Sequence, residues 1–435
     1  MKALPDVWDS APNELIVDTM KLAGERNFAM HSVLPSDPAE WTRKRKDILH
    51  QLGKAMRLEV DHALPLDLEV TGVVAREGYR IEKVCFQSAK KRYVTGCMYI
   101  PDGAGPFPAV LNVHGHWPNG HLEERVQSRG HLLALNGFVC LSVDAFGSGE
   151  RSTVHGEFEP HGGPRGTLLN NLGETLIGIQ VADNMRALDL LCSMPYVDAA
   201  NLGVTGGSGG GNQTMYLAAF DERIKAAVSV CSVGTFQSYV MGSNCICETI
   251  PDGFDICEES GVIASIAPRA YAMFNGLYDE FSTFIPEEML KTYTSARQIY
   301  RMMGVENNLQ YRIFPTPHAY GTDALANMLG FFCRYLKGEG TGEPRPLVDY
   351  RVMRSEEAMV YPKGKRPEKL KGILEYCAIR GETVRKMAAD YHNTGRTCFW
   401  LGWTLLGEWI RDYTAAATWL RKQYEVKSIT SYGYK

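Results

Sequence analysis

Residues 202–210 read LGVTGGSGG, and we begin from this stretch because its two halves predict different local structures. Residues 202–205 are typical of a buried strand, the next five match the pattern G-x-S-x-G, and a helix-like run follows at 212–219. A strand, a tight glycine turn and a helix in this order form a nucleophile elbow, which holds its serine in a strained backbone conformation. A side chain at Gly206 or Gly210 would collide with the neighbouring strand or helix. We therefore expect Ser208 to project its hydroxyl above a sheet.

Two glycine-rich turns could instead cradle a phosphate at a helix N-terminus. The elbow lacks the lysine of a Walker loop, which disfavours this alternative. The turn at 144–151 lacks the third glycine of a dinucleotide fingerprint, and we interpret it as the rim of a pocket. Its Glu150 and Arg151 are expected to form a structural ion pair.

Strand-like and helix-like segments alternate through the middle of the chain. Apolar runs predict an antiparallel hairpin at 81–86 and 93–100, further strands at 109–113, 138–143, 226–230, 270–274 and 309–314, and helices near 126–135 and 176–192. Ahead of them, Asp37 and Pro38 predict the start of an amphipathic helix that carries Trp41, Ile48, Leu49, Leu52 and Met56 on one face. Alternating strands and helices predict an α/β fold with a mostly parallel central sheet and helices on both faces.

A serine hydroxyl is a weak nucleophile at neutral pH, so it needs a base and a group that orients the base. Asp279 follows the strand at 270–274, and His318 follows the strand at 309–314. The carboxyl ends of parallel strands share one edge of the sheet, so Ser208, Asp279 and His318 can meet there. Their order along the chain is the order expected for this triad. Other acids remain open as partners of the histidine: Glu280, Asp323, Asp255 and Glu258.

The tetrahedral intermediate of acyl transfer also needs hydrogen-bond donors. We expect one from the backbone N–H of Gly209, directly after the nucleophile, and one from the backbone N–H of His116, in the loop after the strand at 109–113. His114, Trp117 and Gly207 are predicted to contact the substrate.

A metal site is not predicted. His114, His116 and His121 lie close in sequence but have no carboxylate at ligand spacing, and Cys245, Cys247 and Cys257 lack the spacing of a zinc motif. Eleven scattered cysteines are typical of free thiols in a reducing compartment.

The amino-acid composition disfavours nucleic acids and membranes as partners. The 435 residues are 45% hydrophobic and 22% charged with a net charge of −4, which is typical of a globular protein without attraction for nucleic acid. The start of the chain does not resemble a secretion signal and no run reaches about 18 apolar residues, so we expect a cytoplasmic location without a membrane partner. The expected partner is a small-molecule ester; a homo-oligomer is compatible with the sequence.

From about residue 41 to residue 336 the chain resembles the α/β-hydrolase superfamily, and within it the bacterial esterases similar to acetyl xylan esterase and dienelactone hydrolase. The resemblance rests on ordered blocks at 93–96, 108–116, 144–151, 206–214, 245–248, 267–269 and 275–279. It implies a cofactor-free serine hydrolase of carboxylic esters, often acetyl groups on carbohydrate. The same triad on a thioester, amide or carbon–carbon bond, and a non-catalytic assembly or binding subunit, are the alternatives.

The domain organisation predicted from the sequence has three parts. Residues 1–60 form a helical extension, 61–337 the catalytic domain with an insertion at about 231–267, and 338–435 a linker and a partial second copy. Residues 401–420 match residues 172–191 at eight of twenty positions, and 431–433 then fall on the elbow strand at 204–206. The position equivalent to Ser208 is Lys435, so this partial copy cannot carry a second triad.

Overall fold

The protein is described by a computed structural model, in which residues 12–242 and 245–390 are placed. The chain divides into two compact units, Met1–Tyr376 and Cys377–Lys435. Helix α13 (Ile373–Asp390) begins in the first unit, and its residues from Cys377 onward belong to the second. The predicted partial repeat at 401–435 lies outside the described residues.

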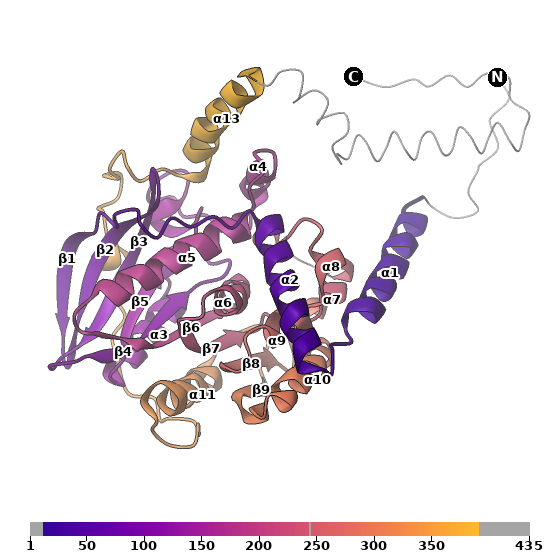
Figure 1. Ribbon diagram of the computed structural model, residues 1–435. Helices are drawn as coiled ribbons and strands as arrows, with labels where there is room; N and C mark the ends of the chain where they lie inside the picture. Colours follow the sequence, from indigo (N-terminus) through magenta and orange to yellow (C-terminus); the bar gives the residue numbers. More distant parts are fainter. Residues whose placement is uncertain (1–11, 243–244, 391–435) are drawn as a thin grey trace, which may run out of the picture. The chain divides into compact units, whose positions relative to one another are not determined.

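A single nine-stranded sheet organises the first unit (Figure 1). Its strands, in sequence order, are β1 (Glu69–Arg76), β2 (Tyr79–Ala89), β3 (Arg92–Pro101), β4 (Phe107–Val113), β5 (Val139–Val143), β6 (Val197–Gly207), β7 (Ile224–Val230), β8 (Ala270–Gly276) and β9 (Leu309–Phe314). In space they lie in the order β1-β2-β3-β5-β4-β6-β7-β8-β9. The first three strands pair antiparallel, β3 also pairs antiparallel with β5, and every pair from β5 to β9 is parallel. The sheet is therefore mostly parallel, as predicted.

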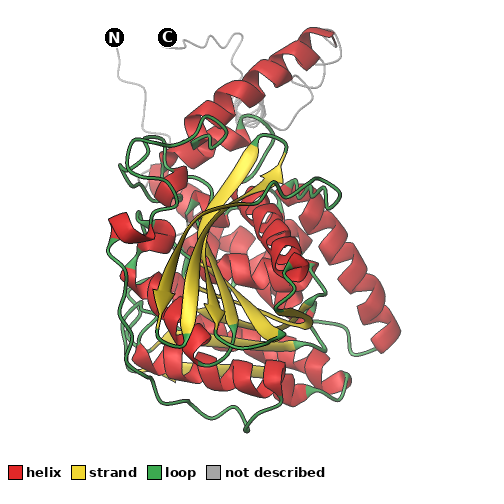
Figure 2. Ribbon diagram, turned by 90° about the vertical axis from the view of Figure 1, so that its left-hand side faces the viewer, coloured by secondary structure: helices red, strands yellow, loops and turns green. Residues whose placement is uncertain are grey.

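Helices cover both faces of the twisted sheet (Figure 2). Besides α13, the described α-helices outside the insertion are α1 (Pro12–His31), α2 (Pro38–Met56), α3 (Glu124–Leu135), α4 (Thr167–Asn170), α5 (Leu176–Ser193), α6 (Gly209–Phe220), α10 (Pro286–Met302), α11 (Thr322–Phe332) and α12 (Ser355–Ala358). Because successive side chains of a strand point to opposite faces, Leu111 of β4 belongs to the core cluster that contains residues of α2, α5, α6 and α10, while its neighbour Val110 belongs to the cluster that contains residues of α3 and α11. The α/β fold with two covered faces is confirmed.

Helix α2 shows how local sequence sets an element. The Asp37 carboxylate accepts a hydrogen bond from the Glu40 N–H at 2.8 Å, and proline occupies the first helical position. The helix then buries Trp41, Ile48 and Leu52 against the main core. Its cap and its apolar face are those predicted.

The insertion at 231–267 leaves the carboxyl end of β7 and contains α7 (Phe236–Met241), α8 (Gly253–Ile256) and α9 (Glu259–Ala264). Helix α1 packs on α7 and α8, and the Asn27 amide donates to the Asp255 carboxylate at 2.7 Å. The predicted N-terminal extension thus covers the insertion. Among the helices described, none has the length and apolar character needed to cross a bilayer.

Residues 345–373 pack against the rest of the first unit, which the sequence did not predict. Met353, Ala358 and Val360 are buried, and Glu357 pairs with Arg76 of β1 at 2.8 Å. The compact unit consequently continues to Tyr376, so the predicted boundary after residue 337 does not coincide with the end of the unit. The segment has almost no regular secondary structure, so the sequence offered no periodicity to detect.

Candidate active site

The nucleophile elbow joins β6 to α6. Ser208 has φ 55° and ψ −130°, a region that L-residues rarely adopt, and its N–H donates to the Val230 carbonyl at 2.9 Å. A Cβ at position 206 would lie 2.4 Å from the Gly210 carbonyl oxygen, and one at position 210 would lie 2.7 Å from the His114 carbonyl carbon. The predicted strand, glycine turn and helix are therefore present.

Asp279 and His318 lie beyond the carboxyl ends of β8 and β9. His318 Nδ1 lies 2.8 Å from Asp279 Oδ2, and Asp279 Oδ1 accepts the Phe281 N–H at 3.0 Å. The rings of Phe281 and Phe284 pack on the imidazole with centroids 4.8 and 5.6 Å away. The carboxylate and the two aromatic rings together fix the orientation of the His318 imidazole.

The other acids considered from the sequence do not contact this imidazole. Glu280 accepts the backbone N–H of His318 at 3.0 Å, Asp255 binds Asn27, and Asp323 is exposed at the start of α11. Glu258 accepts the Glu259 N–H at 3.0 Å at the start of α9. Of the five candidates, the structure places Asp279 against the ring.

Ser208 and His318 line one small cavity of about 20 Å³, together with Gly115, Trp117, Arg125, Arg129, Gly207 and Tyr320. Among the described residues, the side chain within hydrogen-bonding distance of the Ser208 hydroxyl is that of His116, at 3.3 Å from Nδ1. The structure thus brings Ser208 and His318 to one cavity, with Asp279 bound to the His318 ring and the serine hydroxyl turned toward a second histidine.

The sequence predicted a backbone contribution from His116, and the structure places its ring beside the nucleophile as well. Nε2 lies 2.9 Å from Cys247 Sγ, on the opposite side of the ring from Ser208. Burial, with smaller contributions from His318 and His114, lowers the pKa of His116 to about 4. The imidazole is therefore neutral at pH 7.

The backbone of the loop after β4 lies directly on the elbow. A Cβ at Gly115 would come within 2.6 Å of the Gly207 carbonyl oxygen and 3.2 Å of the Gly209 nitrogen. This close approach places His116 and Gly209 beside Ser208, where the predicted pair of oxyanion donors must be. Their role as donors stays a prediction.

The three residues predicted to contact substrate divide into two groups. Trp117 and Gly207 line the cavity, and the Arg125 guanidinium stacks 3.8 Å from the Trp117 ring. His114 instead is fully buried: its Nε2 accepts the Ala145 N–H at 2.9 Å and its Nδ1 lies 2.8 Å from the Gly115 carbonyl oxygen. Burial lowers its pKa to about 4. The structure therefore gives His114 a structural position between two loops, and the predicted substrate contact is not supported.

Glu150 and Arg151 are both buried in the turn after β5, but they do not pair with each other as expected. Arg151 pairs with Asp183 of α5 at 2.8 Å. Glu150 accepts the backbone N–H groups of Val360 and Tyr361 at 2.7 and 2.8 Å. Each residue ties the turn to a different part of the unit, because β5 and α5 are neighbours and residues 360–361 lie over the antiparallel strands.

Two side chains of the site were not singled out from the sequence. Arg129 of α3 lies 4.6 Å from the Tyr320 ring, and the Tyr320 hydroxyl lies 2.8 Å from Thr205 Oγ1. Tyr320 stands two residues after His318, and that proximity was the available signal. Arg129 carried none, since a basic residue on a helix is ordinarily solvated.

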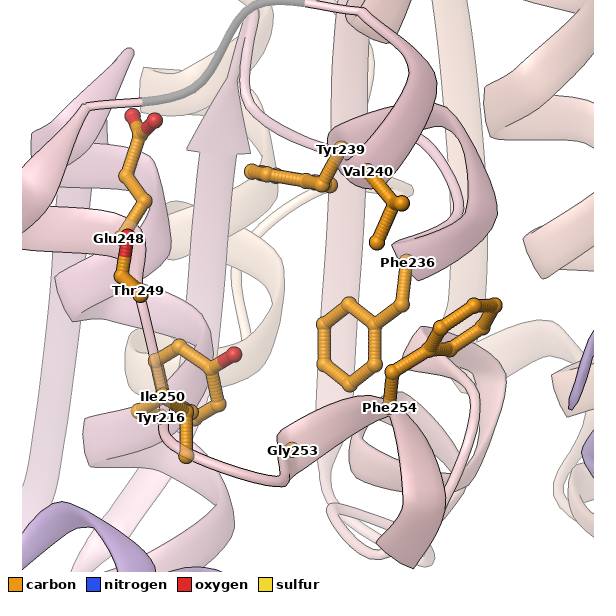
Figure 3. A pocket seen from close by; sticks show the side chains of 9 residues that line it. All are labelled: Tyr216, Phe236, Tyr239, Val240, Glu248, Thr249, Ile250, Gly253 and Phe254. Atoms are coloured by element: carbon orange, nitrogen blue, oxygen red, sulfur yellow. The ribbon is translucent and has the colours of Figure 1, made fainter. Parts of the chain in front are cut away.

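A larger cavity of about 110 Å³ lies within the insertion rather than at Ser208. Phe236, Tyr239 and Phe254 face Thr249 and Ile250 across it, while the Glu248 carboxylate points away from Phe236 and Phe254 (Figure 3). The Tyr239 hydroxyl donates to Asn212 Oδ1 at 2.8 Å, and the Asn212 amide donates to Glu248 at 3.2 Å. Asn212 thus links this apolar cavity to the first turn of the nucleophile helix.

These features define the fold as that of an α/β-hydrolase with a nucleophile elbow. Residues 52–237 match the model of the acetyl xylan esterase family, so this part of the chain is similar to those esterases. A proposed hydrolase, YtaP of Bacillus subtilis (strain 168), is 24% identical over 258 residues, which are 55% of this chain and 81% of that protein.

Solved structures agree on the fold. The methylesterase BT1017 superposes with a TM-score of 0.59 at 20% identity, covering 86% of this chain and 81% of its own. A proposed acetyl xylan esterase from Bacteroides fragilis NCTC 9343 gives a TM-score of 0.56 at 20% identity, with coverage of 72% and 84%. An acetyl xylan esterase from Paenibacillus sp. R4 gives 0.50 at 18% identity, with coverage of 67% and 95%.

Proposed function

We propose that the protein hydrolyses short-chain carboxylic esters, acetyl esters of carbohydrates foremost, through a Ser208–His318–Asp279 triad and an acyl-enzyme. The observation that carries this proposal is the 2.8 Å contact of the His318 ring with Asp279, in the same cavity as a serine on a strained elbow.

The chemistry follows from the roles that these groups can take. Ser208 Oγ attacks the ester carbonyl carbon and its proton passes to His318 Nε2, while Asp279 holds Nδ1–H and stabilises the imidazolium. The N–H groups of Gly209 and His116 stabilise the oxyanion. The proton on His318 then leaves with the alcohol, water attacks the acyl-enzyme, and the acid is released.

The Ser208 hydroxyl must turn from His116 toward His318 for this reaction. Catalytic hydrogen bonds are often long or unformed without substrate and tighten in the complex. A neutral His116 presents either a donor or an acceptor to the hydroxyl, so it can release the hydroxyl without leaving a buried charge behind.

The size of the cavity supports a small acyl group. About 20 Å³ is room for roughly one water-sized group, which suits the methyl of an acetyl ester better than a long chain. The family match points the same way, since that family is named for acetyl ester hydrolysis.

Covalent labelling together with turnover tests the proposal. A fluorophosphonate is expected to label the wild type, and p-nitrophenyl acetate to be hydrolysed faster than the corresponding octanoate. Both signals should disappear in Ser208→Ala and persist in Ser282→Ala, which changes an exposed serine on the neighbouring 281–284 turn. Labelling and turnover that survive in Ser208→Ala would refute the assignment of the nucleophile.

A further inference from the structure

Metal-binding side chains from three segments converge on the side of His116 that faces away from Ser208. One ligand atom each from His116, His161 and Cys247 lies within 4.8 Å of the others, and the same is true of His116, Cys245 and Glu248. The segments are the loop after β4, the loop at 152–163, and the insertion. The proposed triad includes none of these side chains. His116 was assigned a catalytic role through its backbone N–H alone.

His161 is the most unusual member of this group. It is 2% exposed, and neither ring nitrogen has a hydrogen-bond partner within residues 12–242 and 245–390. A buried polar atom without a partner destabilises the fold, so two on one ring point to a ligand.

Two of the residues that pack against these rings are glycines. A Cβ at Gly162 would lie 2.9 Å from His116 Nε2, and one at Gly209 would lie 3.2 Å from that atom and 3.3 Å from His161 Nε2. Glycine at both positions therefore lets the two imidazoles converge directly beside the elbow.

We propose that His116, His161 and Cys247 bind a zinc ion next to the nucleophile. Cys245 and Glu248 are the neighbours that can complete a four-coordinate site; the Glu248 carboxylate lies 3.9 Å from His116 Nε2 and is turned away from the apolar cavity (Figure 3). Two imidazoles with a thiol select a borderline-soft ion such as Zn²⁺ over Mg²⁺, Ca²⁺ or Mn²⁺.

Binding has two chemical consequences. The Cys247 thiol must lose its proton to solvent as the Zn–S bond forms, so binding weakens as the pH falls. A zinc ion on His116 Nε2 also leaves the ring proton on Nδ1, which makes the ring a fixed donor toward Ser208 Oγ 3.3 Å away. The ion thus orients a side chain of the site without itself contacting the substrate.

Metal stoichiometry tests the proposal independently of esterase activity. Chelator-treated full-length protein is incubated with ZnCl₂, separated by gel filtration and analysed by atomic emission; one Zn²⁺ per chain is expected. Co²⁺ in place of Zn²⁺ should produce a thiolate-to-cobalt charge-transfer band. Cys247→Ala and His161→Ala should each lower zinc affinity at least about 100-fold, since loss of a ligand exceeds the 10–100-fold effect of an outer-shell partner.

The matched control is Cys257→Ala, which removes another buried thiol of the same insertion that belongs to neither group. It should retain one Zn²⁺ per chain. Circular dichroism of each variant verifies folding. Wild type that binds no stoichiometric zinc, shows no cobalt–thiolate band, or keeps its zinc in both ligand variants would overturn the proposal. The cobalt spectrum of the wild type tests whether a thiolate binds the metal even if a variant fails to fold.

Discussion

Asp279 is the residue through which the geometry of the site is most directly tested. Asp279→Asn keeps the shape of the side chain but offers an amide to His318 Nδ1, which favours the wrong tautomer of the base. We expect kcat on an acetyl ester to fall about 10³–10⁴-fold. Steady-state kinetics with p-nitrophenyl acetate measure this change.

Glu280→Gln is the control for that variant, because Glu280 accepts the backbone N–H of His318 rather than its ring. A loss of less than about tenfold is expected from this surface substitution. Near-normal turnover by Asp279→Asn would assign the orienting acid to another residue.

The glycines of the elbow make a prediction about stability. Gly206→Ala would place its Cβ 2.4 Å from the Gly210 carbonyl oxygen, which is backbone and cannot rotate away. We expect a loss of about 1–3 kcal/mol in the free energy of unfolding, the usual range for overpacking. Gly321→Ala is the control, since a Cβ there meets nothing within 4 Å. Equal urea midpoints for the two variants would contradict the tight elbow.

At the scale of residues, the positions of strand ends could be predicted from the sequence, whereas the directions of side chains could not. Ser208, Asp279 and His318 could be placed together because each follows a strand that the sequence predicts, and parallel strands share an edge. Nothing in the sequence indicated that the His116 ring faces Ser208, that His114 is buried, or that His161 joins them. These positions depend on rotamers and on the irregular loop at 152–163, and side chains that converge from three distant segments leave no short spacing pattern in the sequence.

Among the elements, the insertion concentrates buried acids. Burial raises the pKa of both Glu248 and Glu258 to about 7, and burial also holds that of Glu259 well above its usual range. Backbone N–H donors, such as that of Glu259 toward Glu258 at 3.0 Å, oppose the effect without cancelling it. The folded insertion therefore keeps protons that the unfolded chain releases.

The sign of the resulting pH dependence is fixed. Glu258 titrates near 4.5 when unfolded and near 7 when folded, so its stabilising contribution is complete below about pH 4.5 and is lost as the pH rises to about 7. The loss is on the order of 3 kcal/mol at about 1.4 kcal/mol per pKa unit. Urea unfolding at pH 5 and pH 8 should show a smaller difference for Glu258→Gln than for wild type. The exposed Glu287→Gln should show the wild-type difference, and an unchanged difference in Glu258→Gln would reject this account.

Prediction of elements succeeded where a pattern was regular. Helix α2 could be predicted from its N-cap and its apolar face. The hairpin of β2 and β3 could be predicted from the alternation of apolar and polar residues. Strand β1 was not predicted, because it is an edge strand whose register shifts between Val70 and Gly72. The shift interrupts the two-residue alternation of buried and exposed side chains, and Val70 and Val73 are both exposed.

For the molecule as a whole, the packing of residues 345–373 predicts where the chain can be shortened. A chain that ends at Lys337 loses the pairing of Glu357 with Arg76 and deprives the Glu150 carboxylate of its two backbone donors. We expect it to be insoluble or strongly destabilised, because it also exposes the core that Met353, Ala358 and Val360 cover. A chain that ends at Asp390 keeps all of these contacts and should retain thermal stability and ester turnover. Solubility and full activity of the shorter chain would show that the predicted boundary after 337 was right.

The hydrogen bonds of Glu150 also impose an order on biosynthesis. Its carboxylate sits in the turn after β5, yet the two groups that satisfy it are 210 and 211 residues further along the chain. At about 5–20 residues per second, a ribosome needs roughly 10 to 40 seconds to reach them. Through that interval Ser208, Asp279 and His318 all emerge while the turn beside them is unfinished. We therefore expect the turn at 144–151 to complete its hydrogen bonds only after translation has passed Tyr361.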